Sequence, residues 1–181
     1  PEERATIDQA VPEKASATPC RPRKLLIFDV NVGYPGHRSI AYANYAFEQM
    51  GKRTGAFTTV LSRDPEVFRP ESLRQFDAVF LNSTVGNPFD DVELRRSLEQ
   101  FVYGGGGLMG VHGTTVAFMR WPGGHEDWPE FGAMLGGRGA AHRAGKEHIF
   151  VKLDSPDHAL NRVFGGKPFE YRDEFFRVHG R

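Results

Sequence analysis

Short apolar runs alternate with amphipathic stretches along most of the chain. Five runs have the length and composition of buried strands, namely 24–30, 57–61, 78–81, 108–111 and 148–153. Ahead of the fourth run, Leu94, Leu98, Phe101 and Val102 recur at the spacing of one buried helical stripe. The pattern therefore predicts strands that are joined by helices.

Polar residues mark where several of these helices begin. Ser39 is placed to cap a helix over 40–52, and Asp90 begins the acidic form of a capping box. Another helix is expected over 128–135, and residues 169–178 have the pattern of a strand interrupted by charges. Strands that alternate with helices pair in parallel. We expect a flavodoxin-like α/β fold, a three-layer sandwich with a mainly parallel sheet.

Residues 1–23 differ from the rest of the chain. They are rich in Pro, Ala, Glu and Lys and show no sustained apolar periodicity. Proline also biases the residue before it away from the helical conformation. We interpret residues 1–23 as an extended arm or linker, and residues 24–181 as one α/β domain.

Composition and charge argue against several classes of partner. The 181 residues are 39% hydrophobic, which suffices for one core of ordinary size. Lys and Arg total 23, as do Asp and Glu, so the formal net charge is zero. This balance argues against a nucleic-acid or membrane-surface partner, because both usually bind a basic patch. No apolar run is long enough to cross a bilayer.

The chain contains a single cysteine, Cys20, in the N-terminal segment. One cysteine excludes an internal disulfide framework and a zinc site built from cysteines. Because Cys20 also lies away from the ends of the predicted strands, a cysteine nucleophile is not expected.

Two predicted strands end in loops that carry a histidine among glycines. The stretch 104–115 passes from four glycines through a strand to His112, and the first strand leads to Tyr34, His37 and Arg38. Ligands of open parallel sheets bind beyond the carboxyl ends of the strands. We therefore expect His37 and His112 to share one site, with a buried structural histidine at 112 as the alternative.

The candidate catalytic residues are His37 and His112 with a carboxylate, Asp173 or Glu174. Imidazole exchanges protons near neutral pH, and sugar chemistry often uses carboxylates. Since Asp173 and Glu174 are adjacent in an extended segment, they point to opposite faces and only one can face a site directly.

Further residues are candidates for binding a ligand. Trp121 and Trp128 could stack on a sugar ring or could equally form a hydrophobic cover. Asp29, at the end of the first strand, could reach the site or brace a loop. The residues that we interpret as substrate-binding are Tyr34, Arg38, Thr114, Trp128 and His142.

The histidines also raise the question of a metal ion. His37, His112 and His142, with Asp173 or Glu174, would form a nitrogen–oxygen set suited to zinc or a similar divalent ion. No pair has the spacing of a helix-borne motif such as HExxH, so the cofactor is left undetermined.

An ordered set of motifs resembles the ThuA-like family, which is linked to trehalose utilisation. The resemblance covers about Lys24 to the C-terminus, and its motifs are residues 33–39, 76–84, 104–112, 128–132, 141–142, 155–158 and 172–175. The resemblance implies a class I glutamine amidotransferase-like fold without the cysteine of that superfamily. It also implies a small-molecule carbohydrate partner, from trehalose or 3-keto-sugar metabolism.

Two functions remain open at this point. One is a sugar-active enzyme, a hydrolase or an isomerase; the other is a non-catalytic carbohydrate-binding or accessory module of a larger protein. The resemblance includes larger, exported proteins, so a periplasmic or exported location is favoured over a cytoplasmic one. A homo-oligomer is compatible with the sequence.

Overall fold

The computed structural model describes residues 2–120, 124–143 and 145–179. The chain divides into two compact units between Arg138 and Gly139, and the expectation of one domain over 24–181 stays a prediction. We call them the N-terminal unit and the C-terminal unit and describe each by itself. Among the described residues, no helix is both long and apolar enough to cross a membrane.

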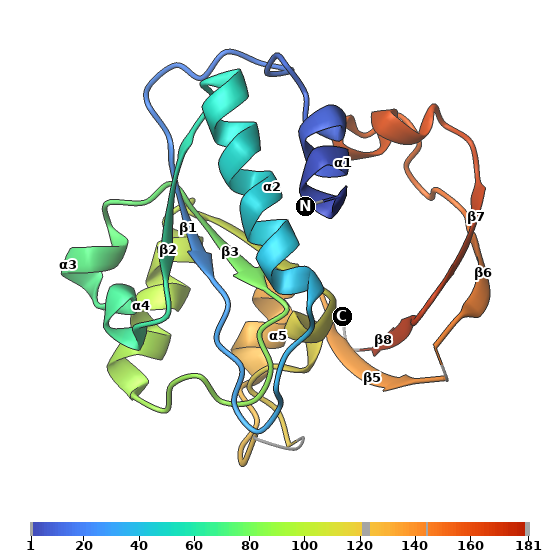
Figure 1. The fold of residues 1–181 in the computed structure, drawn as a ribbon. Coiled ribbons are helices and arrows are strands. Elements are labelled where there is room, and N and C mark those ends of the chain that lie inside the picture. Colours follow the sequence, from blue (N-terminus) through green and yellow to red (C-terminus); the bar gives the residue numbers. More distant parts are fainter. Residues whose placement is uncertain (1, 121–123, 144, 180–181) are drawn as a thin grey trace. The chain divides into compact units, whose positions relative to one another are not determined.

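A parallel sheet of four strands forms the centre of the N-terminal unit (Figure 1). Its strands are β1 (Lys24–Phe28), β2 (Thr58–Ser62), β3 (Ala78–Asn82) and β4 (Gly107–Val111). They lie in the order β2-β1-β3-β4, and every neighbouring pair is parallel. This arrangement confirms the expected mainly parallel α/β sheet.

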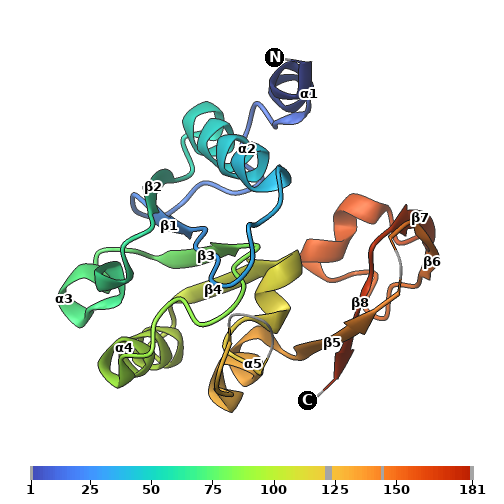
Figure 2. The same cartoon turned by 60° about the horizontal axis from the view of Figure 1, so that its bottom comes forward.

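Helices cover both faces of this sheet, as Figure 2 shows. One face carries α2 (Ser39–Thr54). The other face carries α3 (Pro70–Leu73), α4 (Val92–Tyr103) and α5 (Pro129–Leu135), together with the 3₁₀ helix Pro65–Phe68. Side chains alternate along a strand, so Leu26 and Phe28 face the larger core while Leu25 and Ile27 pack with Phe47 of α2. The result is the predicted three-layer sandwich.

Helix caps differ from the sequence prediction by one residue. Ser39 is already helical, and the residue before it, Arg38, makes no side-chain capping bond. At α4 the cap is Asp91 rather than Asp90, because the Asp91 carboxylate accepts a hydrogen bond from the backbone N–H of Glu93 at 2.8 Å.

The N-terminal segment begins with a helix, α1 (Glu2–Ala10), where an extended arm was expected. Tertiary contacts hold it on α2: the Tyr45 hydroxyl donates to Asp8 at 3.0 Å, and Arg53 donates to the Asp8 carbonyl. Val11, just after the helix, is buried. These contacts compensate for the absence of an apolar stripe. Residues 12–22 contain no helix or strand.

The C-terminal unit contains two ladders of two strands each. The segment expected as a fifth parallel strand belongs to one of these ladders. β6 (Glu147–Val151), expected as strand five, pairs antiparallel with β7 (Phe169–Asp173). Its residues alternate between more and less exposed positions, whereas strands of a covered parallel sheet are apolar throughout. The second ladder joins β5 (Arg138–His142) to β8 (Phe176–His179). β5 was not predicted, because its Gly-Ala-Ala centre lacks apolar alternation.

Candidate functional site

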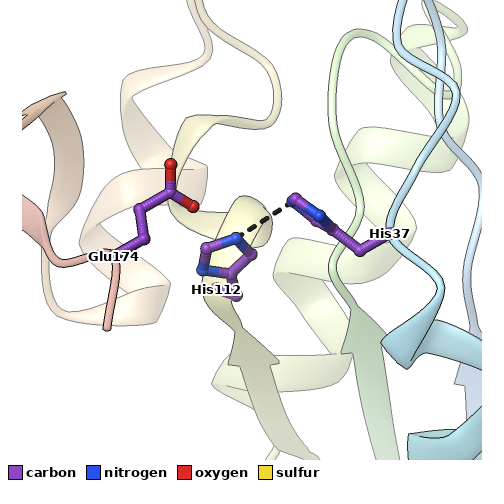
Figure 3. A group of neighbouring side chains, drawn as sticks. All are labelled: His37, His112 and Glu174. Atoms are coloured by element: carbon purple, nitrogen blue, oxygen red, sulfur yellow. Dashed lines mark hydrogen bonds between the residues drawn. The ribbon is translucent and has the colours of Figure 1, made fainter. Parts of the chain in front are cut away.

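His37 and His112 lie side by side beyond the carboxyl ends of the parallel strands (Figure 3). Their Nε2 atoms are 3.1 Å apart, and the rings meet edge to face with centroids 4.8 Å apart. His37 lies in the loop between β1 and α2, and His112 opens the 3₁₀ helix His112–Val116 that follows β4. The structure therefore brings together the two histidines that the loop pattern singled out.

The backbone at this edge adopts a conformation that is unusual for residues with a side chain. Ser83, after β3, has φ 55°, and His112, after β4, has φ 50°. Non-glycine residues in the left-handed region cost of order 1–3 kcal/mol and cluster at functional sites. Ser83 was missed as a feature of this edge, since no sequence signal marks a serine for that conformation.

Gly113 lets the chain turn tightly after His112. A Cβ at this position would lie 2.7 Å from Cγ2 of Val85 and 3.2 Å from Oγ of Ser83. A larger residue would therefore push the turn away from the loop after β3. The glycine that drew attention in the sequence is needed for close backbone packing beneath His112.

Tyr34 contacts the histidine pair through His37. Its hydroxyl lies 3.1 Å from Nε2 of His37, the same nitrogen that faces His112. Tyr34 is partly exposed and meets the His37 ring edge-on. The next predicted ligand, Arg38, is exposed beside it.

A cavity of about 690 Å³ opens next to His37. Its lining comes from the ends of β1 and β2 and from the first turn of α2, and includes Asp29, Asn31, Tyr34, His37, Arg38 and Arg63. Its volume lies within the 300–1,000 Å³ that is typical of small-molecule sites. This edge of the sheet can therefore hold a ligand the size of a sugar.

Asp29 anchors Arg63 at this cavity. The buried carboxylate accepts hydrogen bonds from Nε of Arg63 at 2.6 Å, from Nη2 of Arg63 at 3.0 Å and from Asn44 at 2.7 Å. Burial alone would raise the pKa of Asp29, but the hydrogen bonds from Arg63 and Asn44 and the charge of Arg63 outweigh it and lower that pKa. Asp29 is thus an ionised group that positions Arg63. Arg63 could not be recognised as a site residue from the sequence, because it lies in a turn.

Thr114 and Trp128 are structural residues and not exposed ligands. The Thr114 hydroxyl is fully buried, donates to the Leu81 carbonyl at 2.8 Å and accepts from the Thr84 N–H at 3.2 Å. Trp128 is 4% exposed within the aromatic core, and its indole N–H donates to Glu99 at 2.8 Å. Packing therefore takes both side chains out of solvent, and the binding roles expected from the sequence stay predictions. Trp121 lies outside the described residues.

The other predicted site residues belong to the C-terminal unit. His142, on β5, lies with Nδ1 2.9 Å from a carboxylate oxygen of Glu174 and packs edge-on against Phe176. Asp173 accepts hydrogen bonds from the Tyr171 hydroxyl at 2.9 Å and from the backbone N–H of Glu174 at 2.8 Å. Glu174 thus has a histidine partner within this unit.

A second group of potential metal ligands lies on the surface of the N-terminal unit. It consists of Asp90, His125 and Glu126. Arg95 forms ion pairs with both Asp90 and Glu126. Because a guanidinium already balances these carboxylates, we interpret the group as a surface ion-pair cluster.

Comparison with known proteins identifies the family. The family model for ThuA, described as trehalose utilisation, matches residues 24–181. No protein with a curated description matches the chain. Among solved structures, the chain is similar to the crystal structure of a ThuA-like protein from Bacteroides uniformis ATCC 8492, with a TM-score of 0.66 and 17% sequence identity.

The structural match and the family match cover different shares of the chains and support different conclusions. The structural match covers 91% of this chain and 65% of the Bacteroides chain. At this identity it shows a shared fold, and this chain spans less than two thirds of the other's length. The family model, in contrast, covers all of the sequence that follows the N-terminal segment, residues 24–181. The chain therefore belongs to the ThuA family, whose model is described as trehalose utilisation.

Proposed function

We propose that this protein is a sugar-active enzyme, a hydrolase or an isomerase, that acts on trehalose or a 3-keto sugar and uses His37 and His112 for proton transfer. The separation of 3.1 Å between their Nε2 atoms carries the proposal. Family membership supports the substrate class, and the cavity beside His37 supports binding of a molecule of that size.

The geometry of the pair suits proton transfer. Two facing imidazole nitrogens form a hydrogen bond only when one carries a proton and the other offers a lone pair. His37 and His112 then hold a donor and an acceptor at one position, and Tyr34 adds a hydroxyl to the same nitrogen of His37. A group positioned in this way typically contributes about 10²–10⁴-fold to a rate by general acid–base catalysis.

The proposal also includes a carboxylate, for which we choose Glu174 over Asp173. The motif at residues 172–175 contains both carboxylates, and the pairing of Glu174 with His142 supports the choice. Glu174→Gln and Asp173→Asn are a matched pair of near-isosteric changes. We expect the first to reduce turnover much more than the second.

The decisive experiment is a turnover assay with a panel of trehalose, 3-keto-trehalose, sucrose and 3-keto-sucrose, with products identified by NMR spectroscopy. We expect turnover of at least one sugar, and its loss in both His37→Gln and His112→Asn. Binding of a sugar without any product would favour the alternative function, a non-catalytic carbohydrate-binding module. The cavity beside His37 supports sugar binding in either function, and product formation decides between them.

The histidine pair could also contribute two ligands to a divalent ion. Zinc–nitrogen bonds of about 2.0–2.1 Å place two tetrahedral ligands about 3.3 Å apart, close to the observed 3.1 Å. Measuring bound zinc after dialysis separates the two roles. Zinc that is retained by the wild-type protein and lost in His112→Asn would replace the proton-transfer role with metal ligation.

A further inference from the structure

Arg63 combines a rigid anchor with free hydrogen-bond donors. Two of its nitrogens, Nε and Nη2, are held by the two oxygens of Asp29, whose side chain is completely buried. The Arg63 side chain itself is 69% exposed. Within the described part of the chain, Nη1 has no hydrogen-bond partner, and the guanidinium lines the cavity beside His37. Its remaining N–H groups are therefore available to a ligand.

The anchor continues into the protein as a chain of buried and half-buried polar groups. Asn44 of α2 donates to Asp29 and accepts from the amide of Asn82 at 2.8 Å, and Asn82 also donates to the Ile40 carbonyl at 2.9 Å. Burying a carboxylate is costly unless it is paired and hydrogen-bonded. This network satisfies the Asp29 carboxylate and fixes the direction in which Arg63 points.

The charges around the cavity nearly balance. Arg38 and Arg63 are positive and Asp29 is negative. Glu3 of α1 lies within the electrostatic field of Arg38: a backbone hydrogen bond lowers the pKa of Glu3 most, and Arg38 lowers it further. Asp29 offsets the charge of Arg63, and Glu3, which does not line the cavity, offsets part of the charge of Arg38. The Arg63 guanidinium therefore offers hydrogen-bond donors with little net charge, which favours a neutral ligand that accepts hydrogen bonds over a phosphorylated one. Vicinal hydroxyl groups match the parallel N–H donors of a guanidinium.

We propose that the cavity beside His37 is a subsite for a neutral polyhydroxylated ring, and that Arg63 is its specificity-determining residue, with Asp29 as the residue that positions it. The inference rests on the proposed function for its substrate class. It differs from that function because it concerns binding alone and assigns no role in proton transfer to Arg63 or Asp29.

Titration of the ¹⁵N-labelled protein with trehalose, glucose and glucose 6-phosphate, followed by NMR spectroscopy, tests the subsite. We expect trehalose or glucose to shift the Nε–H signal of Arg63 and the amide signals of Asn31 and Ala41. Arg63→Gln should weaken binding about tenfold to hundredfold, the range for a lost hydrogen bond from a charged group. The matched control is Arg74→Gln at an exposed arginine away from the cavity, and its affinity should equal that of the wild type.

Two further variants keep the test decisive if Arg63→Gln folds poorly. The double variant Asp29→Asn with Arg63→Gln leaves no buried charge, and it should fold and bind weakly. Asp29→Asn alone should raise Kd while it broadens the Arg63 Nε–H signal, which a purely structural role would leave sharp. Unchanged affinity in the Arg63 variants, no binding of either neutral sugar, or tighter binding of glucose 6-phosphate would overturn the proposal.

The outcomes also separate this inference from the proposed function. Arg63-dependent binding without turnover would leave the subsite in place and refute the enzyme. Turnover with a KM that is the same in Arg63→Gln as in the wild type would leave the enzyme in place and refute the subsite.

Discussion

The Nε2 atom of His112 lies 3.1 Å from the Nε2 atom of His37, across 75 positions of sequence. Each histidine follows a different strand of one parallel sheet, so neither local segment alone creates the contact. The pair depends on the pairing of β1, β3 and β4 in one sheet, which sets their carboxyl ends at a common edge. Substitutions at this edge, measured for both turnover and unfolding, can therefore show whether a residue acts in the reaction or holds the fold.

His112→Asn should abolish turnover and leave the melting temperature nearly unchanged. Asparagine tolerates the left-handed backbone that His112 adopts, and a partly exposed side chain contributes little packing. We expect turnover to fall at least about 100-fold, while the alanine variant loses the same activity with a slightly lower melting temperature. A large drop in melting temperature in both variants would instead identify His112 as a structural residue, and full activity would remove it from the site.

Gly113→Ala should impair both stability and turnover. The added methyl group would clash with Val85 and displace the turn that holds His112, and overpacking of this kind costs typically 1–3 kcal/mol. Gly145→Ala is the matched control, because a Cβ there meets no atom within 4 Å. Urea unfolding and turnover of both variants check the expectation. Equal stability of the two variants would contradict the close packing beneath His112.

Thr114→Val should destabilise the protein although valine has nearly the same shape as threonine. The change leaves the Leu81 carbonyl and the Thr84 N–H without their partner, at about 1–3 kcal/mol for each buried group. Thr59→Val, on β2, provides the comparison, since its half-buried hydroxyl makes no hydrogen bond within the described residues. Thermal unfolding measures the difference. If Thr114→Val were as stable as wild type but failed to bind sugar, Thr114 would be a ligand after all.

The contribution of Asp29 to the free energy of unfolding should be lost at acidic pH. Its pKa is lower in the folded protein than its ordinary value of 3.8. The resulting stabilisation is complete above the unfolded-state pKa and is lost as the pH falls through the folded-state value. Free energies of unfolding between pH 7 and pH 2 should therefore decline less steeply in Asp29→Asn than in wild type. Asp154→Asn, at an exposed position, should reproduce the wild-type slope; identical slopes in all three proteins would refute the linkage to Asp29.

Cys20→Ser should retain full turnover and the wild-type melting temperature. Cys20 is exposed, and its sulfur accepts only a long contact of 3.4 Å from Arg23 among the hydrogen bonds of the described residues. A serine hydroxyl can replace that contact. A folded but inactive Cys20→Ser protein would show that the chemistry depends on a thiol, contrary to the site described above.

The sequence by itself determined the layered α/β fold and the placement of the two histidines. The apolar runs 24–30, 78–81 and 108–111 are a local property, and parallel pairing then places the carboxyl ends of these strands at the same edge. His112 could be expected there because it directly follows the third of these segments, and His37 because it lies in the loop that leaves the first.

Only the tertiary structure decided which polar and aromatic residues accompany that pair. Thr114 and Trp128 looked like ligands, but long-range packing buries both, while Asp29 and Arg63 meet only because β1 and β2 are neighbours. Long-range pairing also decided the place of β6, which pairs antiparallel with β7 and does not join the parallel sheet. Local pattern fixes the period of a segment, whereas burial and ion pairing depend on which distant segments pack against it.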